Sequence, residues 1–340
     1  MSKFMKVLFT VSAIIVALFL AMLIISLASS GWKFSKLGSG KYEAIGHGIS
    51  ENFDSISIDS KTAKIKILPS GDHECHVQCY EWEKIKSSVY VEDGTLKIKR
   101  TDTRKWYDYL TFNFGQATIT VYLPAKDFSS LSVRSSTGDV TVENISADEV
   151  SVTLSTGDIS LLGVSAGEAK IKASTGDVKL ADSGVTNATL TTSTGDISLS
   201  GVIASGTIAL SASTGDTTVK NVEAKSLTAD ASTGSARFTG VSVAETLSSE
   251  RDTGITYLTR TVAKKFTVTA DTGDVILSGA DAEEIFITTD TGDVKGTLLS
   301  DKVYIVRTDT GKIDVPKTVT GGRCEITTDT GDIKITVAAE

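Results

Sequence analysis

The sequence predicts an all-β fold: a parallel β-solenoid of about eleven rungs, each 19–20 residues long, with an N-terminal β cap and one transmembrane helix before it. Three observations support this prediction. A Thr-Gly-Asp tripeptide or a near variant recurs at a constant step, apolar residues alternate on both sides of each copy, and residues 7–27 form one apolar run. A period of about 20 residues is typical of repeat architectures, in which each unit stacks on its neighbours.

The N-terminal apolar run, residues 7–27, is interrupted only by Thr10, Ser12 and Ser26. A helix of that length would measure about 31 Å, the thickness of the hydrocarbon layer of a membrane. The run is longer than the apolar region of a cleavable signal peptide, although residues 26–28 also resemble a cleavage site. We therefore expect an uncleaved signal anchor in the cell membrane, single-pass, with the body of the protein outside the cytoplasm.

The tripeptide sets the period of the remaining chain. Its copies follow one another at steps of 19 or 20 residues. The Thr of each copy stands at 137, 156, 175, 194, 214, 233, 253, 272, 291, 310 and 330.

Strands are expected on both sides of each tripeptide. Around Thr137, for example, Leu131 and Val133 precede it and Val140 and Val142 follow it. Alternation with period two indicates a strand with one buried face. The inward parity changes across the tripeptide, so the chain must bend there, as Gly and Asp permit. The predicted bend residues are Gly138, Asp139, Gly157, Asp158, Gly176, Asp177, Gly195, Asp196, Gly273, Asp274, Gly292, Asp293, Gly331 and Asp332.

Two short strands cannot bury a face alone, but stacked rungs enclose a continuous core. Eleven rungs spaced by about 4.8 Å would form a rod of about 53 Å. An antiparallel sandwich or barrel also has short, evenly spaced strands. Identical bends at a fixed step favour the solenoid.

The chain is expected to divide into four parts: an anchor (1–30), a linker (31–50), a β cap (51–130) and the solenoid (131–340). The cap prediction depends on alternating strand patterns that do not follow the period, and on the need to cover the first rung. No cap is visible at the other end. Either a partner covers that edge, end-on self-association does, or charges such as Lys334 discourage pairing.

Composition limits the chemistry. The chain has 3 Cys and 3 His, too few for a disulfide scaffold, and no cofactor is expected. Residues 1–136 carry 17 basic and 13 acidic residues, whereas residues 137–340 carry 17 and 29. An acidic body repels phosphate backbones, so we expect no nucleic-acid partner.

Two acidic motifs accompany the repeat. Asp-Thr-Gly, the local motif of aspartic proteases, begins at 252, 271, 290, 309 and 329. Protease chemistry needs two carboxylates that share a proton, whereas these copies are related by translation, so no catalytic residue is predicted. The Asp after each Gly forms a ladder that backbone N–H groups can stabilise without metal. Calcium binding is the alternative.

The only dense group of metal-ligand residue types is His73, Cys75, His76 and Cys79. In a strand, residues 73, 75 and 79 would share one face and His76 would lie on the other. Zinc sites usually combine two ligand pairs, and no second pair is visible. No metal site is predicted here.

The rung at Thr253 breaks the pattern. Ser249 and Arg251 take positions that are apolar or small elsewhere, and Ile255 replaces the Asp. A bulge that accommodates Arg251, or a seam between two duplicated arrays, is the favoured interpretation. A binding site at Arg251 is the alternative.

The segments FDSISI (53–58) and TVYLP (120–124), together with the Ser-Thr-Gly-Asp repeats, resemble a bacterial family of putative adhesins, β-strand-repeat proteins of unknown function. The resemblance covers most of the chain after residue 50. It implies an envelope protein but assigns no binding residue.

Three classes of function follow. The first is a non-enzymatic, membrane-tethered envelope scaffold or adhesin-like recognition module, whose partner is an envelope protein or a glycan. The second is a carbohydrate-binding or carbohydrate-active β-helix protein. The third is recognition by hydroxyl ladders, although the parity of the repeated Thr matches the inward side of the preceding strand. Partner-binding residues are expected on the cap, at Trp82, Trp106, Tyr107 and Tyr109, which could instead form its core.

Overall fold

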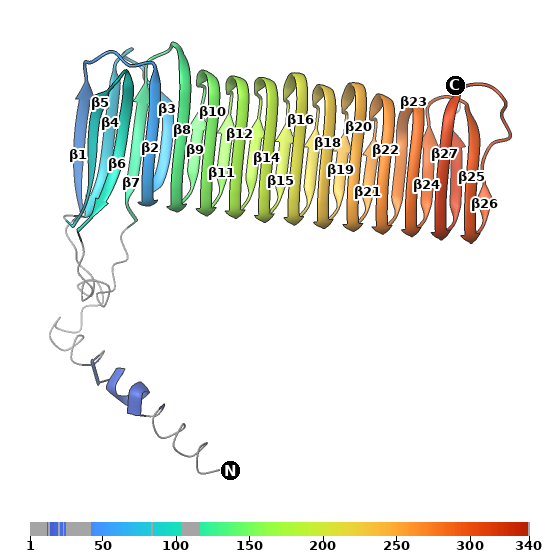
Figure 1. Cartoon of the computed structure of the whole chain (residues 1–340), viewed down its shortest axis with the longest axis horizontal. Helices are drawn as coiled ribbons and strands as arrows, with labels where there is room; N and C mark the ends of the chain where they lie inside the picture. The colour runs from blue at the N-terminus through green and yellow to red at the C-terminus, as the bar shows by residue number, and fades with distance from the viewer. Residues whose placement is uncertain are drawn as a thin grey trace.

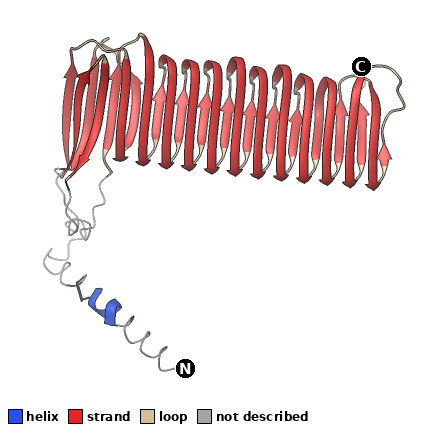
Figure 2. Ribbon diagram, viewed as in Figure 1, coloured by secondary structure: helices blue, strands red, loops and turns tan. Residues whose placement is uncertain are grey.

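The computed structural model describes residues 12, 14–19, 21–22, 24, 42–82, 84–103 and 116–338. Residues 42–82, 84–103 and 116–338 form one straight rod of stacked strands (Figure 1; Figure 2). The prediction of an all-β parallel solenoid of about eleven turns is confirmed.

Each regular turn consists of a long strand, a bend at the tripeptide and a short strand. The long strands are β8 (Asp127–Thr137), β10 (Ser146–Thr156), β12 (Ser165–Thr175), β14 (Gly184–Thr194), β16 (Ile203–Thr214), β18 (Glu223–Thr233), β20 (Ser242–Thr253) and β22 (Val262–Thr272). The short strands are β9 (Val140–Glu143), β11 (Ile159–Leu162), β13 (Val178–Ala181), β15 (Ile197–Ser200), β17 (Thr217–Lys220), β19 (Ala236–Thr239) and β21 (Thr256–Thr259). Long strands pair in parallel in one sheet and short strands in a second sheet, so each repeat aligns with the next.

The core lies between the two sheets. Leu131, Val133, Val140 and Val142 are all 0% exposed, as the alternating pattern predicts. The Gly at the bend adopts a positive φ, for example 140° at Gly195. This turn of the backbone is why the inward-facing residues change from odd to even offsets, or the reverse, across the bend. The Gly N–H then donates to the Thr carbonyl of the following rung, which continues the ladder through the bend.

A second corner lies seven residues after the Thr in the rungs from Thr137 to Thr272, and the sequence reasoning missed it. Asn144, Gly163, Asp182 and Gly201 occupy this corner in successive rungs, and all have positive φ. Asn and Asp tolerate the left-handed region better than other non-glycine residues do. The recurrence of these three residue types at one offset was the available signal.

The solenoid begins before residue 131, so the predicted division at 130 is wrong. The N-terminal strands are β1 (Tyr42–Ile49), β2 (Ser55–Thr62), β3 (Lys64–Pro69), β4 (Cys75–Trp82), β5 (Ile85–Glu92), β6 (Thr95–Asp102) and β7 (Thr118–Leu123). Strands β2 and β3 pair in parallel with β8 and β9, and β6 and β7 pair in parallel with β2 and β3. Strands β1, β4 and β5 pair antiparallel beyond them. Thr62-Ala63-Lys64 stands at the bend, and because Ala63 replaces the Gly, the sequence did not reveal this rung.

The C-terminal rungs are stacked out of sequence order. The strands there are β23 (Val275–Thr291), β24 (Val294–Leu298), β25 (Lys302–Thr310), β26 (Ile313–Asp314), β27 (Gly322–Thr330) and β28 (Ile333–Val337). Strand β27 lies between β23 and β25, and β28 lies between β24 and β26 (Figure 1). The rung of β27 and β28 is therefore inserted between the rung of β23 and β24 and the rung of β25 and β26.

In the N-terminal segment, the described residues 12, 14–19, 21–22 and 24 are helical. Among the residues that the structure describes, no helix is both long and apolar enough to cross a membrane. The remainder of the predicted anchor, 7–27, lies outside the described residues.

Candidate functional site

The bend aspartates form a hydrogen-bonded ladder along one edge of the rod. The Asp158 N–H donates to Asp139 Oδ1 at 3.3 Å, and the Asp177, Asp196 and Asp216 N–H groups each donate to the Asp Oδ1 one rung before, at 2.9, 2.8 and 2.7 Å. The ladder resumes from Asp274 through Asp293 and Asp332 at 2.9 Å per step. Each carboxylate thus accepts a bond from the next rung rather than from its own backbone.

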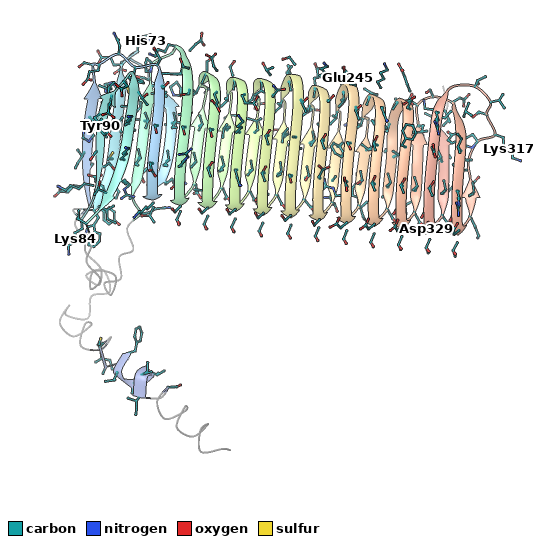
Figure 3. The ribbon with its side chains drawn as sticks, viewed as in Figure 1. His73, Lys84, Tyr90, Glu245, Lys317 and Asp329 are labelled. Carbon is teal, nitrogen blue, oxygen red and sulfur yellow. The ribbon has the colours of Figure 1, made fainter. Side chains whose placement is uncertain are left out.

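The residues before each Gly face solvent. The repeated Thr is exposed at every bend, which corrects the expectation that its side chain shares the inward parity. The five Asp of the Asp-Thr-Gly copies are exposed beside them, and Asp329 is seen on this edge in Figure 3. They form a row along the rod, not a facing pair, so the geometry of an aspartic protease is not formed.

The aromatic residues expected to bind a partner are only partly placed. Trp82, at the end of β4, is 8% exposed, so its ring belongs to the protein interior and cannot anchor a partner. It lines a pocket of about 240 Å³ with Tyr42 and Ile85. Trp106, Tyr107 and Tyr109 lie outside the described residues. Tyr80 is 45% exposed and stacks on Tyr42 with ring centroids 5.1 Å apart.

The His and Cys group does not assemble as the strand pattern predicted. His73 precedes β4 in a turn, with φ of 62°, so it does not share a strand face with the cysteines. Cys75 and Cys79 are buried, and burial raises the pKa of both thiols, to about 11 for Cys75. His76 points outward and lies 2.7 Å from Asp72.

Asp72, Glu74 and His76 are the three residues here whose ligand atoms lie within 4.8 Å of one another. Asp72 already accepts hydrogen bonds from Ser70, His76 and the Glu74 N–H, which hold the pKa of its carboxyl well below its usual range. These hydrogen bonds explain why the three residues lie together, in a turn that leads into β4.

Aromatic rings on the outside of the solenoid are covered by cations. Lys265 Nζ lies 4.7 Å from the centroid of the Phe286 ring, and the Arg323 guanidinium lies 5.2 Å from it. The Arg237 guanidinium lies 5.0 Å from the Tyr257 ring. These faces are therefore occupied by the protein's own side chains and are poor platforms for sugar rings.

The irregular rung buries its arginine. Arg251 is 1% exposed and points into the core beside the bend. The register shift of its strand lies at Val243–Thr246, so no bulge is formed at Arg251 itself. Its strand β20 keeps in register with β18 and β22 from Leu247 to Thr253. Burial lowers the pKa of Arg251 to about 10, so the guanidinium stays charged at neutral pH.

The C-terminal end of the rod is open. Strand β25 pairs with β27 on one side, and no described strand pairs with its other side. Leu299, Val303, Ile305 and Ile313 near this edge are 51%, 38%, 50% and 47% exposed. The core-facing residues of the end rung are only half-buried, whereas their equivalents one rung inward are buried. An unpaired strand edge therefore coincides with exposed apolar side chains.

A charged contact holds this end in place. Lys302 is 3% exposed, and its Nζ lies 2.6 Å from Asp281 Oδ1 and 2.6 Å from Ser300 Oγ. Ser300 in turn donates to the other oxygen of Asp281 at 2.7 Å. These bonds tie the first residue of β25 to Asp281 of β23 and so position the open edge.

Comparison with known proteins identifies the family. The family model described as Toastrack DUF4097 matches residues 53–207, 193–247 and 242–340. No curated protein matches the chain.

Among solved structures, similar chains are "putative adhesins" from Bacteroides fragilis and Parabacteroides distasonis. The first is 16% identical, with a TM-score of 0.36 over 86% of this chain and 97% of that one. The second is 15% identical, with a TM-score of 0.42 over 87% and 98%. A "putative lipid binding protein" from Parabacteroides distasonis is 13% identical, with a TM-score of 0.31 over 88% and 98%.

Proposed function

The chain belongs to the Toastrack DUF4097 family, and we propose that it is a non-enzymatic recognition module or scaffold of the cell envelope. In this proposal residues 7–27 hold it in the cell membrane, single-pass, and the solenoid projects outside the cytoplasm. Strands β1, β4 and β5 cap the near end of the rod. The observation that carries the proposal is the open C-terminal end, where an unpaired strand edge and exposed apolar residues coincide.

The arrangement of titratable groups supports a non-enzymatic role. The ladder carboxylates accept backbone hydrogen bonds from the following rung, for example at 2.8 Å between Asp177 and the Asp196 N–H. The exposed Asp residues of the Asp-Thr-Gly copies lie along the rod, one in each rung. General acid–base catalysis needs a titratable side chain held within hydrogen-bond reach of the reacting group, whereas the ladder carboxylates are held against backbone N–H groups.

The geometry of the rod suits recognition at a distance from the membrane. Strands β6, β2 and β8 begin a continuous parallel stack that runs to β27 and β25. With strands about 4.8 Å apart, the stack is on the order of 60 Å long. An anchor before β1 would place the apolar end far from the bilayer. An edge strand with free N–H and C=O groups accepts an added strand from a partner protein.

The experiment is a cross-linked pull-down from intact envelopes with the full chain and two matched variants. Ile305→Lys places a charge on the open edge. Ile203→Lys places the same charge at an exposed position in the middle of the rod, where the side chain is 62% exposed. We expect the same envelope protein to be captured by the wild type and Ile203→Lys, and to be lost with Ile305→Lys. Equal capture by all three proteins, or turnover of any glycan, would contradict the proposal.

Glycan binding is a second candidate, favoured by the exposed Thr at every bend. Together with the adjacent Ser or Asp, these Thr make a regular row of hydrogen-bonding groups along one edge. Binding of the full chain to purified wall polymers, with ice as a further test surface, would be reduced by Thr175→Val with Thr194→Val. If the double variant binds wall polymers as well as the wild type does, the Thr row is not the glycan-binding site.

Trp106, Tyr107 and Tyr109 are a further proposed partner contact. Trp106→Ala should remove a captured partner without changing the melting temperature. An unchanged set of partners at unchanged stability would remove Trp106 from the interface.

A further inference from the structure

The rung at Thr253 places a permanent charge inside the solenoid. Arg251 occupies the position two residues before the Thr, which is Ala231 and Ala270 in the adjoining rungs. All three positions face the core, and Arg251 is 1% exposed. A guanidinium thus stands where the neighbouring rungs have a methyl group.

None of the guanidinium nitrogens has a hydrogen-bond partner among the described residues, since Nε, Nη1 and Nη2 are all buried and unpaired. Burial of a charge without hydrogen bonds is strongly unfavourable. The nearby carboxylates do not remove this cost. Asp230 and Asp216 act on Arg251 electrostatically, but Asp216 is bound to Arg237 at 2.8 Å and accepts the Ser235 N–H at 2.8 Å.

Three buried hydroxyl groups in the same part of the core are also unpaired: those of Ser249, Thr217 and Thr256. Ser249 lies two residues before Arg251 on the same strand face, and Thr256 follows the same bend. Thr217 and Thr256 flank Ala236 on the facing sheet. Ser60, in the rung of Thr62 near the N-terminal end of the rod, also has a buried and unpaired hydroxyl, but no other described rung combines such hydroxyls with a fully buried guanidinium. Several other inward hydroxyls do have partners. Thr192 and Thr289, for example, donate to the carbonyls of Gly176 and Gly273 at 3.0 and 3.2 Å.

All of these unpaired groups can donate a hydrogen bond, because a guanidinium has only donors and each hydroxyl can donate. We propose that they form an internal site for one small monovalent anion of the size of chloride. Its charge would compensate that of Arg251, and the hydroxyls would complete its coordination.

The surrounding side chains suit an ion of that size. The rung before Arg251 has alanine at three inward positions, 229, 231 and 236, all at most 8% exposed. At the position of Ala229, the preceding rung has Leu210 and the following rung has Ser249, with Val268 one rung further on. These small side chains offset the volume of the guanidinium, and in this proposal the ligand is limited to the size of a single ion.

The first test measures the melting temperature of the purified full chain at constant ionic strength in chloride, bromide, nitrate or gluconate. A ligand that binds only the native state raises stability with the logarithm of its concentration. We expect the melting temperature to rise by about 2 °C or more for each tenfold increase in chloride or bromide, and not to rise with gluconate. Equal melting curves in chloride and gluconate would overturn the proposal.

Matched variants assign the effect to this site. Arg251→Met retains length without charge and should abolish the difference between chloride and gluconate. Thr217→Val should reduce it. Arg307→Met, at an arginine whose side chain is 75% exposed, should leave it unchanged. If Arg251→Met and Arg307→Met both keep the wild-type difference, the anion binds elsewhere and the proposal is wrong.

Crystals of the wild-type protein grown with bromide provide a test that does not depend on a variant that folds. An anomalous peak in contact with the Arg251 guanidinium is the expected result. Water in its place, or a rotated Arg251 that reaches Asp230, would overturn the proposal.

Discussion

At the bends, the space for a Cβ atom decides whether a residue other than glycine is tolerated. A Cβ added to Gly195 would lie 2.1 Å from the carbonyl oxygen of Gly176, and φ there is 140°. We expect Gly195→Ala to lower the free energy of unfolding by about 2–4 kcal/mol, because both the contact and the dihedral are unfavourable. Denaturant unfolding measures the change. Gly184→Ala is the control, since no atom lies within 4 Å of its added Cβ. Equal losses in the two variants would show that the bend does not require glycine.

The ladder carboxylates are expected to act as hydrogen-bond acceptors without a metal. Asp177 Oδ1 accepts the Asp196 N–H at 2.8 Å. Asp177→Ala removes that acceptor and should cost about 1 kcal/mol, whereas Asp177→Asn keeps an oxygen there and should cost less. The melting temperature of the wild type should not change when a chelator is added. A chelator-dependent fall in the melting temperature would instead support calcium in the ladder.

The three cysteines should be unreactive in the native state. Burial raises the pKa of Cys75 to about 11 and that of Cys324 to about 12, so at pH 8 both remain protonated. The thiolate is the reactive form. Iodoacetamide should therefore label none of the three thiols before unfolding and all of them afterwards, as measured by mass spectrometry. Rapid labelling of Cys75 in the native protein would contradict its burial in β4.

At the scale of elements, the C-terminal rungs depend on one another in an order that differs from the sequence. Strand β25 pairs with β27, and β26 with β28. Removal of residues 315–340 should therefore leave residues 302–310 without a neighbour, and their amide hydrogens should lose protection from exchange. Removal of residues 301–340 is the control, because it takes away both rungs together. Residues 275–291 should stay protected in both proteins. Protection of residues 302–310 after the first deletion would mean that they pair elsewhere.

The repeat predicted the rungs, their bends and the inward residues, because the spacing of Leu131, Val133, Val140 and Val142 directly records which side chains are buried. It could not predict which rung neighbours which. Parallel rungs of one length have the same repeat pattern, so the pattern gives no sign that β27 lies between β23 and β25.

The candidate sites were hard to predict for the same reason, because they depend on contacts between rungs or strands that the repeat does not specify. Arg251 stood out in the sequence because it breaks the pattern, but its burial depends on the alanines of another rung. The open edge at Ile305 depends on the order of the rungs, which the sequence does not reveal. Trp82 has a residue type common at interfaces, yet its position at the end of β4 buries it.

At the scale of the whole molecule, the two ends of the rod differ in a way that determines how copies can associate. The outermost strands at the N-terminal end, β1 and β5, run antiparallel to their neighbours, whereas the edge strand β25 at the other end continues the parallel stack. A head-to-tail filament would require two complementary ends. Association of two copies through their C-terminal ends is therefore the expected mode when no partner covers them.

The full chain, purified in detergent, should accordingly form dimers as its concentration rises, and sedimentation velocity would detect them. Ile305→Lys should shift the protein to monomers, because the added charge stands on the edge strand through which the copies would pair. Ile203→Lys places an equal charge on a side chain that is 62% exposed in the middle of the rod, and it should dimerise like the wild type. If both variants dimerise equally, the association does not use the apolar end. If the wild type stays monomeric throughout, the exposed edge must be protected by its own charges, such as the Arg307–Asp309 pair at 3.0 Å.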